Sequence, residues 1–394
     1  MDGMKRIGLL LGGLLLFPGL VAAQFNFSSA RSLNQVQSAW TLEQGLFSVS
    51  GLGRIFGQNT TAPSGGALTV YDASGRLFIN YGLGKKLEIS FAPLLYQDAN
   101  IPDAKVNAPD DFVLGLKLGS LGSPIAPWSY AFQLASRIPT GKNHNLPFEP
   151  YSAGRASFGV MTMLSFSRDP LYPERSTNFH VNLGYWNHND VGAELIRRGD
   201  PSTEPHNMSQ EIQFGVGVMI PKRTFDFSFE LYGAGFLQAP PSSAYSRENY
   251  LYFTPLVFYK AARWFTLKAG VDLRVVNTAD ETLYAPAQGG VSRTITGSQP
   301  NYPAWRLNVG TTFSWHSSRL YRVRNRDMLM QKAQTRRELF EQIIEDQRAT
   351  ESAEAELERI RTERIRVERE LERLRRILER EAEVQEAVHE LESK

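Results

Sequence analysis

The sequence predicts an all-β transmembrane antiparallel barrel of about twelve strands, followed by a long C-terminal α-helix or coiled coil. Three observations lead to this prediction. Hydrophobic and polar residues alternate between residues 45 and 315, the connections are alternately short and long, and residues 326–394 contain no Gly or Pro. The 394 residues include no Cys, and 43 Lys/Arg stand against 41 Asp/Glu. This composition excludes a disulfide scaffold and a thiol nucleophile, and we expect no nucleic-acid partner.

Residues 1–23 have the three parts of a secretory signal peptide. Lys5 and Arg6 supply positive charge, residues 7–17 are apolar, and small residues end at Ala23. The apolar run is shorter than the roughly 20 residues that a membrane-spanning helix needs. We therefore expect cleavage after Ala23, and a signal peptide in a chain without Cys is typical of the bacterial envelope.

Residues 24–43 precede the first expected strand. Leu33, Val36, Gln37 and Trp40 follow helical spacing, so we expect a short helix. Two roles stay open for it, a periplasmic lead-in or a plug of the barrel.

The predicted barrel, residues 44–318, depends on period-two alternation. Residues 225–231 are the clearest example, because three Phe and one Leu lie on one face while Asp226, Ser228 and Glu230 lie on the other. Such runs begin near Gly45, Leu77, Leu87, Phe112, Ser129, Gly154, Asn178, Glu211, Phe225, Tyr250, Phe265 and Trp305. The even number of runs places both ends of the barrel on the same, periplasmic side.

The connections between these runs separate into two classes in strict alternation. The short ones are 84–86, 121–128, 167–177, 221–224 and 260–264; the long ones are 54–76, 97–110, 139–153, 187–210, 238–249 and 277–304. One alternative stays open, in which residues 67–71 and 291–296 extend strands into the long connections or add a hairpin. Outer-membrane barrels have short periplasmic turns and long outer loops, whereas a secreted β-sandwich, the alternative, needs no such alternation. We expect outer-membrane lipid around the barrel and interfacial girdles formed by Tyr185, Tyr259, Trp264, Phe265, Trp305, Phe313 and Trp315.

Two short stretches resemble known families. Asn308, Gly310, Phe313 and Trp315 are similar to the C-terminal signal of bacterial outer-membrane barrels, which implies recognition by the barrel-assembly machinery. That signal usually ends the chain, and here the chain continues. Residues 136–141 and 147–155 resemble the outer-membrane transporter group named after the phenol meta-cleavage pathway. This resemblance implies a barrel that handles small hydrophobic or aromatic compounds, and it carries over no substrate residue.

The polar face of the predicted strands supplies candidate pore-lining residues of both signs. They are Glu88, Lys117, Arg137, Arg155, His180, Glu211, Asp226, Glu230, Lys268, Asp272, Arg274 and Arg306. They form either a polar pore or a network of ion pairs that fills the lumen. Barrels of about eight strands are filled by side chains and those of 16 to 18 are open, so twelve strands leave both interpretations open.

Residues 319–394 form the predicted helical coiled coil in the periplasm. Residues 326–394 contain 15 Lys/Arg and 19 Asp/Glu. The apolar seam consists of Leu357, Ile360, Val367, Leu371, Leu374 and Leu378, and Arg364 interrupts it. A solitary helix stabilised by its charges is the alternative. The tail implies a homo-oligomer or a periplasmic partner.

The sequence predicts no enzyme, no cofactor and no metal site. No HExxH pair, GxSxG elbow or phosphate-binding loop occurs. His180 is placed in the lumen, but the His-x-Ser-Asn stretch of the outer-membrane phospholipase family is absent. His188, Asn189, Asp190 and Glu194 offer a weaker alternative, a loop site for a divalent cation. Two functions therefore compete: a narrow porin-like channel for small solutes, or a structural anchor whose coiled coil links the outer membrane to a periplasmic or cell-wall partner.

Overall fold

The computed structural model describes residues 27, 31–61, 67–99, 107–123, 126–146, 148–170, 172–195, 203–276, 281–283, 301–316 and 320–392. The predicted signal peptide, residues 1–23, lies outside the described residues. The chain divides into two units, Met1–Arg324 and Asn325–Lys394.

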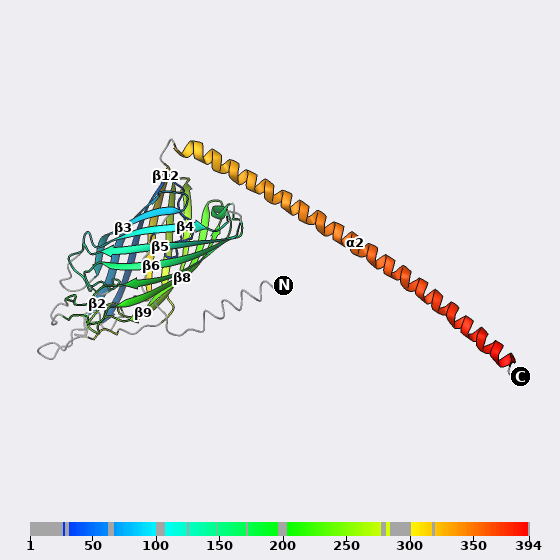
Figure 1. The fold of residues 1–394 in the computed structure, drawn as a ribbon. Coiled ribbons are helices and arrows are strands. Elements are labelled where there is room, and N and C mark those ends of the chain that lie inside the picture. The colour runs from blue at the N-terminus through cyan, green and yellow to red at the C-terminus, as the bar shows by residue number, and fades with distance from the viewer. Residues whose placement is uncertain are drawn as a thin grey trace. The chain divides into compact units, whose positions relative to one another are not determined.

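Twelve antiparallel strands close into one barrel within the first unit (Figure 1). They are β1 (Leu46–Thr61), β2 (Ala67–Gly82), β3 (Leu87–Ala99), β4 (Phe112–Leu121), β5 (Trp128–Ile138), β6 (Ser157–Ser167), β7 (Asn178–Asn187), β8 (Gln210–Pro221), β9 (Phe225–Gln238), β10 (Tyr250–Ala262), β11 (Phe265–Arg274) and β12 (Trp305–His316). Each strand pairs with its neighbours in sequence, and β12 pairs with β1 from Leu46–His316 to Ile55–Leu307. A short 3-10 turn, η1 (Pro173–Arg175), precedes β7. The predicted barrel is confirmed, and the sandwich is excluded because no sheet edge remains.

The first long connection is the largest error of the sequence prediction. Residues 54–76 were expected to form a loop, but β1 and β2 continue through most of this range and only residues 62–66 separate them. Arg54 and Phe56 turn away from the outer surface while Ile55 is 54% exposed, so period two continues. The pattern is hidden in the sequence because Phe56 is an apolar residue on the inner face.

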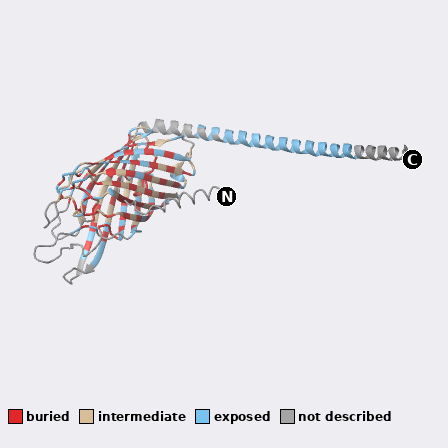
Figure 2. Ribbon diagram, turned by 60° about the horizontal axis from the view of Figure 1, so that its bottom comes forward, coloured by how far each residue is buried: buried red, intermediate tan, exposed pale blue. Residues whose placement is uncertain are grey.

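The two faces of the barrel differ in exposure, as the alternating bands of Figure 2 show. In β5, Phe132 and Leu134 are 56% and 60% exposed, whereas the alternate residues Gln133 and Ala135 are buried. An apolar surface of this extent around a closed barrel fits contact with lipid rather than water. Aromatic rings gather at the ends of strands, for example Trp264 and Phe265 against Phe313, with ring centroids 6.1 and 4.7 Å apart.

The second unit contains most of α2 (Leu320–Glu392), a single helix of 73 residues. Exposed ion pairs one turn apart, such as Arg337–Glu341 at 2.9 Å and Arg364–Glu368 at 3.1 Å, support it. The predicted helix is confirmed, while its association into a coiled coil stays a prediction. In the described part of the chain, no helix is both long enough and apolar enough to span a membrane.

Candidate functional site

Nine of the candidate pore-lining residues are buried on the inner face of the barrel. They are Glu88, Lys117, His180, Glu211, Asp226, Glu230, Lys268, Asp272 and Arg306. Arg137 and Arg274 are half-buried; Arg137 pairs with Asp111, and Arg274 donates to the carbonyl oxygen of Tyr302. The structure therefore gathers these side chains, and their role in a conducting pore stays a prediction.

Arg155 does not belong to this set. It precedes β6 rather than lying on a strand, and its side chain is exposed. Its guanidinium donates to the carbonyl oxygens of Val191 and Gly192, at 3.0 and 2.7 Å. Arg155 was assigned to the lumen because the strand was expected to begin near Gly154, three residues too early. The residue instead joins two loops.

Residues 31–43, called the N-terminal segment below, lie inside the barrel. The expected helix is absent from them, since they form only bends, turns and irregular backbone. The reason is that their N–H groups bind barrel side chains instead of carbonyl oxygens one turn away. Oε1 of Glu230 accepts the N–H of Asn34 at 2.7 Å, and its Oε2 accepts those of Gln35 and Val36 at 2.6 and 2.8 Å.

Other lumen side chains hold the N-terminal segment along its length. Asn182 Oδ1 accepts the N–H of Gln37 at 2.6 Å, Ser165 Oγ that of Ala39 at 2.7 Å, and Glu88 Oε2 that of Leu42 at 2.8 Å. Lys117 Nζ donates to the carbonyl oxygen of Trp40 at 3.0 Å. Backbone groups removed from water require such partners. Several predicted pore-lining charges thus serve to hold a segment of the chain itself.

The N-terminal segment is also packed tightly. Leu33 and Val36 are 1% and 0% exposed and join a cluster with Tyr232 and Tyr252. The helical spacing in the sequence therefore reflects packing of these apolar side chains against the barrel wall and not a helix. The segment contacts strands near their short connections, as Thr41 shows by binding Ser120 Oγ and the carbonyl oxygen of Lys85.

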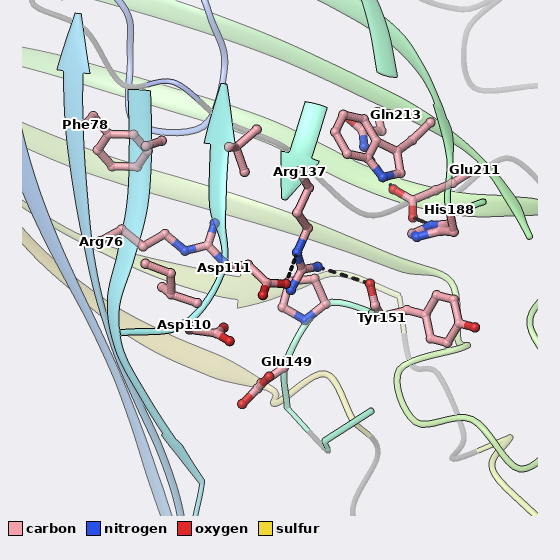
Figure 3. Close-up of a pocket in the computed structure, with 15 residues that line it drawn as sticks. Arg76, Phe78, Asp110, Asp111, Arg137, Glu149, Tyr151, His188, Glu211 and Gln213 are labelled. Carbon is pink, nitrogen blue, oxygen red and sulfur yellow. Dashed lines mark hydrogen bonds and ion pairs between the residues drawn. The ribbon is translucent and has the colours of Figure 1, made fainter. Parts of the chain in front are cut away.

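Among the described residues, two cavities lie near the long connections. The larger, of about 70 Å³, is lined by the residues drawn in Figure 3, and the smaller, of about 20 Å³, shares Arg76 and Pro150 with it. Since about 10–15 Å³ on this measure holds one water, the larger cavity has room for about five to seven water molecules. Neither of these two cavities is a wide aqueous channel.

Charged groups meet in the larger cavity from several elements. Arg137 Nε lies 2.6 Å from Asp111 Oδ2, and Arg137 Nη1 donates to the carbonyl oxygen of Tyr151 at 3.2 Å. His188 Nε2 lies 2.9 Å from Glu211 Oε2 (Figure 3). These contacts fix the walls of the cavity from the loops after β3, β5 and β7.

Three loop carboxyl groups in this cavity have shifted pKa values. Burial, reinforced by the nearby charge of Asp110, raises the pKa of Glu149 well above its usual range. Burial likewise raises the pKa of Asp110, with Asp111 adding to the shift. Burial alone would raise the pKa of Asp111 too, but the Arg137 guanidinium and the N–H of Gly141 hold it below its usual range. Asp111 is thus the charged partner of Arg137, whereas Glu149 favours the neutral form.

One Ser–His pair lies on the inner face of the barrel. Ser165 Oγ lies 2.7 Å from His180 Nδ1, but both side chains are buried beneath the N-terminal segment, and Ser165 also accepts the N–H of Ala39. Among the described residues, no cluster of three or more His, Cys, Asp or Glu side chains could hold a metal ion. Asp190, part of the loop alternative for a cation, instead accepts hydrogen bonds from Tyr151 and Ser209.

Several lining residues were missed from the sequence. Arg54, Asp72 and Arg76 fell in the range expected to be a loop, and Asp110 and Glu149 lie in loops that fold toward the lumen. The continued alternation of Arg54, Ile55 and Phe56 was the available signal for the first group. Nothing in the sequence indicated the second group, because loop placement depends on tertiary contacts.

No protein-family model matches the sequence, and no curated protein matches it either. Among solved structures, the chain is similar to an outer-membrane channel from Pseudomonas putida F1, with 12% identity, a TM-score of 0.43, and coverage of 70% of this chain and 98% of that one. The NanC porin is similar with 12% identity and a TM-score of 0.40, and the match covers 68% of this chain and 98% of the porin. The toluene transporter TbuX of Ralstonia pickettii is similar with 10% identity and a TM-score of 0.29, and the match covers 70% of this chain and 90% of the transporter.

Proposed function

We propose that the chain forms a narrow, porin-like channel for small solutes in the bacterial outer membrane. One observation carries this proposal: a closed barrel with an apolar outer face keeps ionisable side chains and unfilled space on its inner face. A barrel that served only as an anchor has no need to bury Lys268, Asp272 and Arg306, whose removal from water is costly. Ionisable linings are the means by which pores select solutes.

The N-terminal segment is the closing element of this channel. It is attached by hydrogen bonds and packing alone, and Glu230 alone accepts three of its N–H groups. Each hydrogen bond to a charged group contributes about 1.5–3 kcal/mol. Replacing Glu230 by Gln therefore weakens closure without removing volume from the barrel.

Single-channel recording in a planar lipid bilayer tests the proposal. The mature chain, residues 24–394, is expected to give rare, small current steps, and Glu230→Gln to lower the closed-to-open ratio by roughly tenfold or more, since about 1.4 kcal/mol corresponds to tenfold. Glu204→Gln, at an exposed loop position, is the matched control and should behave as the wild type.

Two results would contradict the proposal. Silence from folded wild-type and Glu230→Gln barrels would reject a channel. Equal currents from wild type and Glu230→Gln would show that the N-terminal segment does not close the lumen.

An anchoring function is the second candidate, and α2 favours it. The described seam residues Leu357, Ile360, Val367, Leu371 and Leu374 are 54–60% exposed on the single chain, while the side chain of Leu378 lies outside the described residues. An apolar stripe along so long a helix is suited to association in the periplasm. The two functions are compatible, because they reside in different units of the chain.

A further inference from the structure

Three arginines converge on the smaller cavity from neighbouring strands. Arg306 lies on β12, Arg54 on β1 and Arg76 on β2, and these strands are consecutive around the point where the barrel closes. Asp72 is the one carboxylate among the described residues lining this cavity. The cavity wall therefore has an excess of two positive charges.

Hydrogen-bond donors in this wall exceed acceptors. The Nε atoms of Arg54, Arg76 and Arg306 and the hydroxyl of Tyr232 are buried without a hydrogen-bond partner. Asp72 cannot serve them all, because its Oδ1 accepts from Gln97 Nε2 at 3.1 Å and its Oδ2 lies 3.7 Å from Arg306 Nε. Four orphaned donors at one cavity require an explanation in a missing acceptor.

An anion meets this requirement better than water. A water molecule that accepts from two donors must itself donate two hydrogens, and this wall is short of acceptors. A carboxylate only accepts hydrogen bonds, and its negative charge balances the excess positive charge of the arginines. It also matches the planar guanidinium group with two parallel hydrogen bonds. At about 20 Å³ the cavity has room for one or two groups the size of a water, which suits the oxygens of a carboxylate and not the rest of the molecule.

The adjoining larger cavity offers space for the apolar part of such an acid. Its wall includes the apolar side chains of Phe78, Leu94, Val113 and Trp186, and Arg76 stands between the two cavities. Figure 3 shows Arg76 extending from β2 toward the middle of this space, away from Phe78. Opposite it, Arg137 is already neutralised by Asp111. The wall also contains Glu211, which lies 2.9 Å from His188 Nε2, and the buried carboxyl groups of Glu149 and Asp110, whose raised pKa values favour the neutral form. The excess of positive charge is therefore at the Arg54–Arg76–Arg306 end.

We propose that Arg54, Arg76, Arg306 and Tyr232 form a binding site for the carboxylate of a small organic acid whose apolar part lies in the larger cavity. This inference rests on the proposed channel and names the class of solute that it admits. Sequence alone predicted a lining of balanced charge; the structure separates the charges, because acidic residues such as Glu88 and Glu230 are engaged by the N-terminal segment.

Calorimetric titration of the full mature chain in detergent, in buffer low in chloride, tests the site. Sodium benzoate is the probe, and benzyl alcohol, which keeps the ring and loses the charge, is its control. We expect saturable benzoate binding, no comparable binding of benzyl alcohol, and a loss of roughly 10- to 100-fold in benzoate affinity in Arg76→Gln. Arg168→Gln, an exposed arginine after β6, should leave the affinity unchanged.

Tyr232→Phe provides a second variant should Arg76→Gln fail to fold, since it removes only the hydroxyl; we expect weaker benzoate binding there too. Absence of benzoate binding to the wild type, equal binding of benzyl alcohol, or unchanged affinity in a folded Arg76→Gln or Tyr232→Phe variant would overturn the proposal. Titration requires no current. Benzoate binding by a barrel that never conducts would therefore reject the channel alone, and conduction without benzoate binding would reject this site alone.

Discussion

Single side chains determine whether the lumen of this barrel is filled or available. Glu230 and Glu88 bind backbone N–H groups of the N-terminal segment, so their charges are satisfied internally. The Nε atoms of Arg54 and Arg76 are buried without a hydrogen-bond partner among the described residues. Ionisable residues that look alike in the sequence therefore have opposite roles, one group holding the chain and the other facing open space.

Glu149 should make stability depend on pH. A carboxyl group whose pKa is raised in the folded state binds its proton more tightly there than in the unfolded chain, where the pKa is about 4.3. Stability is then lost as the pH rises above that value. We expect Glu149→Gln to raise the thermal midpoint in detergent, more at pH 8 than at pH 5.

The matched control for this experiment is Glu194→Gln, which changes an exposed loop carboxylate. It should shift the midpoint little at either pH. If Glu149→Gln gave the same shift at pH 5 and pH 8, ionisation of Glu149 would not be the cause.

At the scale of elements, the sequence predicted most of the strands, but it did not predict what fills the barrel. Ten of the twelve expected starts lie within one residue of the observed ones, because alternation fixes each strand locally. β2 begins at Ala67 and not near Leu77, and its first part was missed because inward Phe56 on β1 and Val70 on β2 break the rule that polar residues face the lumen. The helix expected in the N-terminal segment was wrong for another reason. The N–H groups of this segment bind residues such as Glu230, 194–196 positions away, and no local sequence pattern indicates such contacts.

The closing strand β12 contains Gly310, the glycine of the predicted assembly signal. The packing around Gly310 explains why a residue without a side chain is needed there. A Cβ at Gly310 would lie 2.6 Å from the carbonyl oxygen of Gly51 and 2.6 Å from Lys268 Cε. The carbonyl belongs to β1 and cannot retreat without disturbing the pairing that closes the barrel.

We therefore expect Gly310→Ala to destabilise the folded barrel by about 1–3 kcal/mol, the usual cost of overpacking. Urea unfolding in detergent measures this. Gly57→Ala is the control on β1, because a Cβ there meets nothing within 4 Å, and its effect should stay within about 0.5 kcal/mol. Equal effects of the two substitutions would show that the close approach at Gly310 is relieved at no cost.

On the scale of the whole molecule, the two units follow different physical rules. The barrel is specified by contacts between residues distant in sequence, whereas α2 is supported by pairs such as Arg366–Glu370 within one turn. Local ion pairs of this kind contribute only about 0.2–0.5 kcal/mol each. They explain why a helix forms, but they do not explain an apolar seam that remains exposed on a single chain.

Association through α2 would account for that seam. We expect the full mature chain to sediment in detergent as an oligomer, and Val367→Ser combined with Leu374→Ser to reduce it to a monomer. Arg369→Ser combined with Arg376→Ser has the same seven-residue spacing on another face of the helix and should leave the oligomer intact. A monomeric wild type would instead favour the solitary, charge-stabilised helix. In that case the seam is too weak to drive self-association, and the anchoring function would require a different periplasmic partner whose own apolar surface covers Leu357 to Leu374.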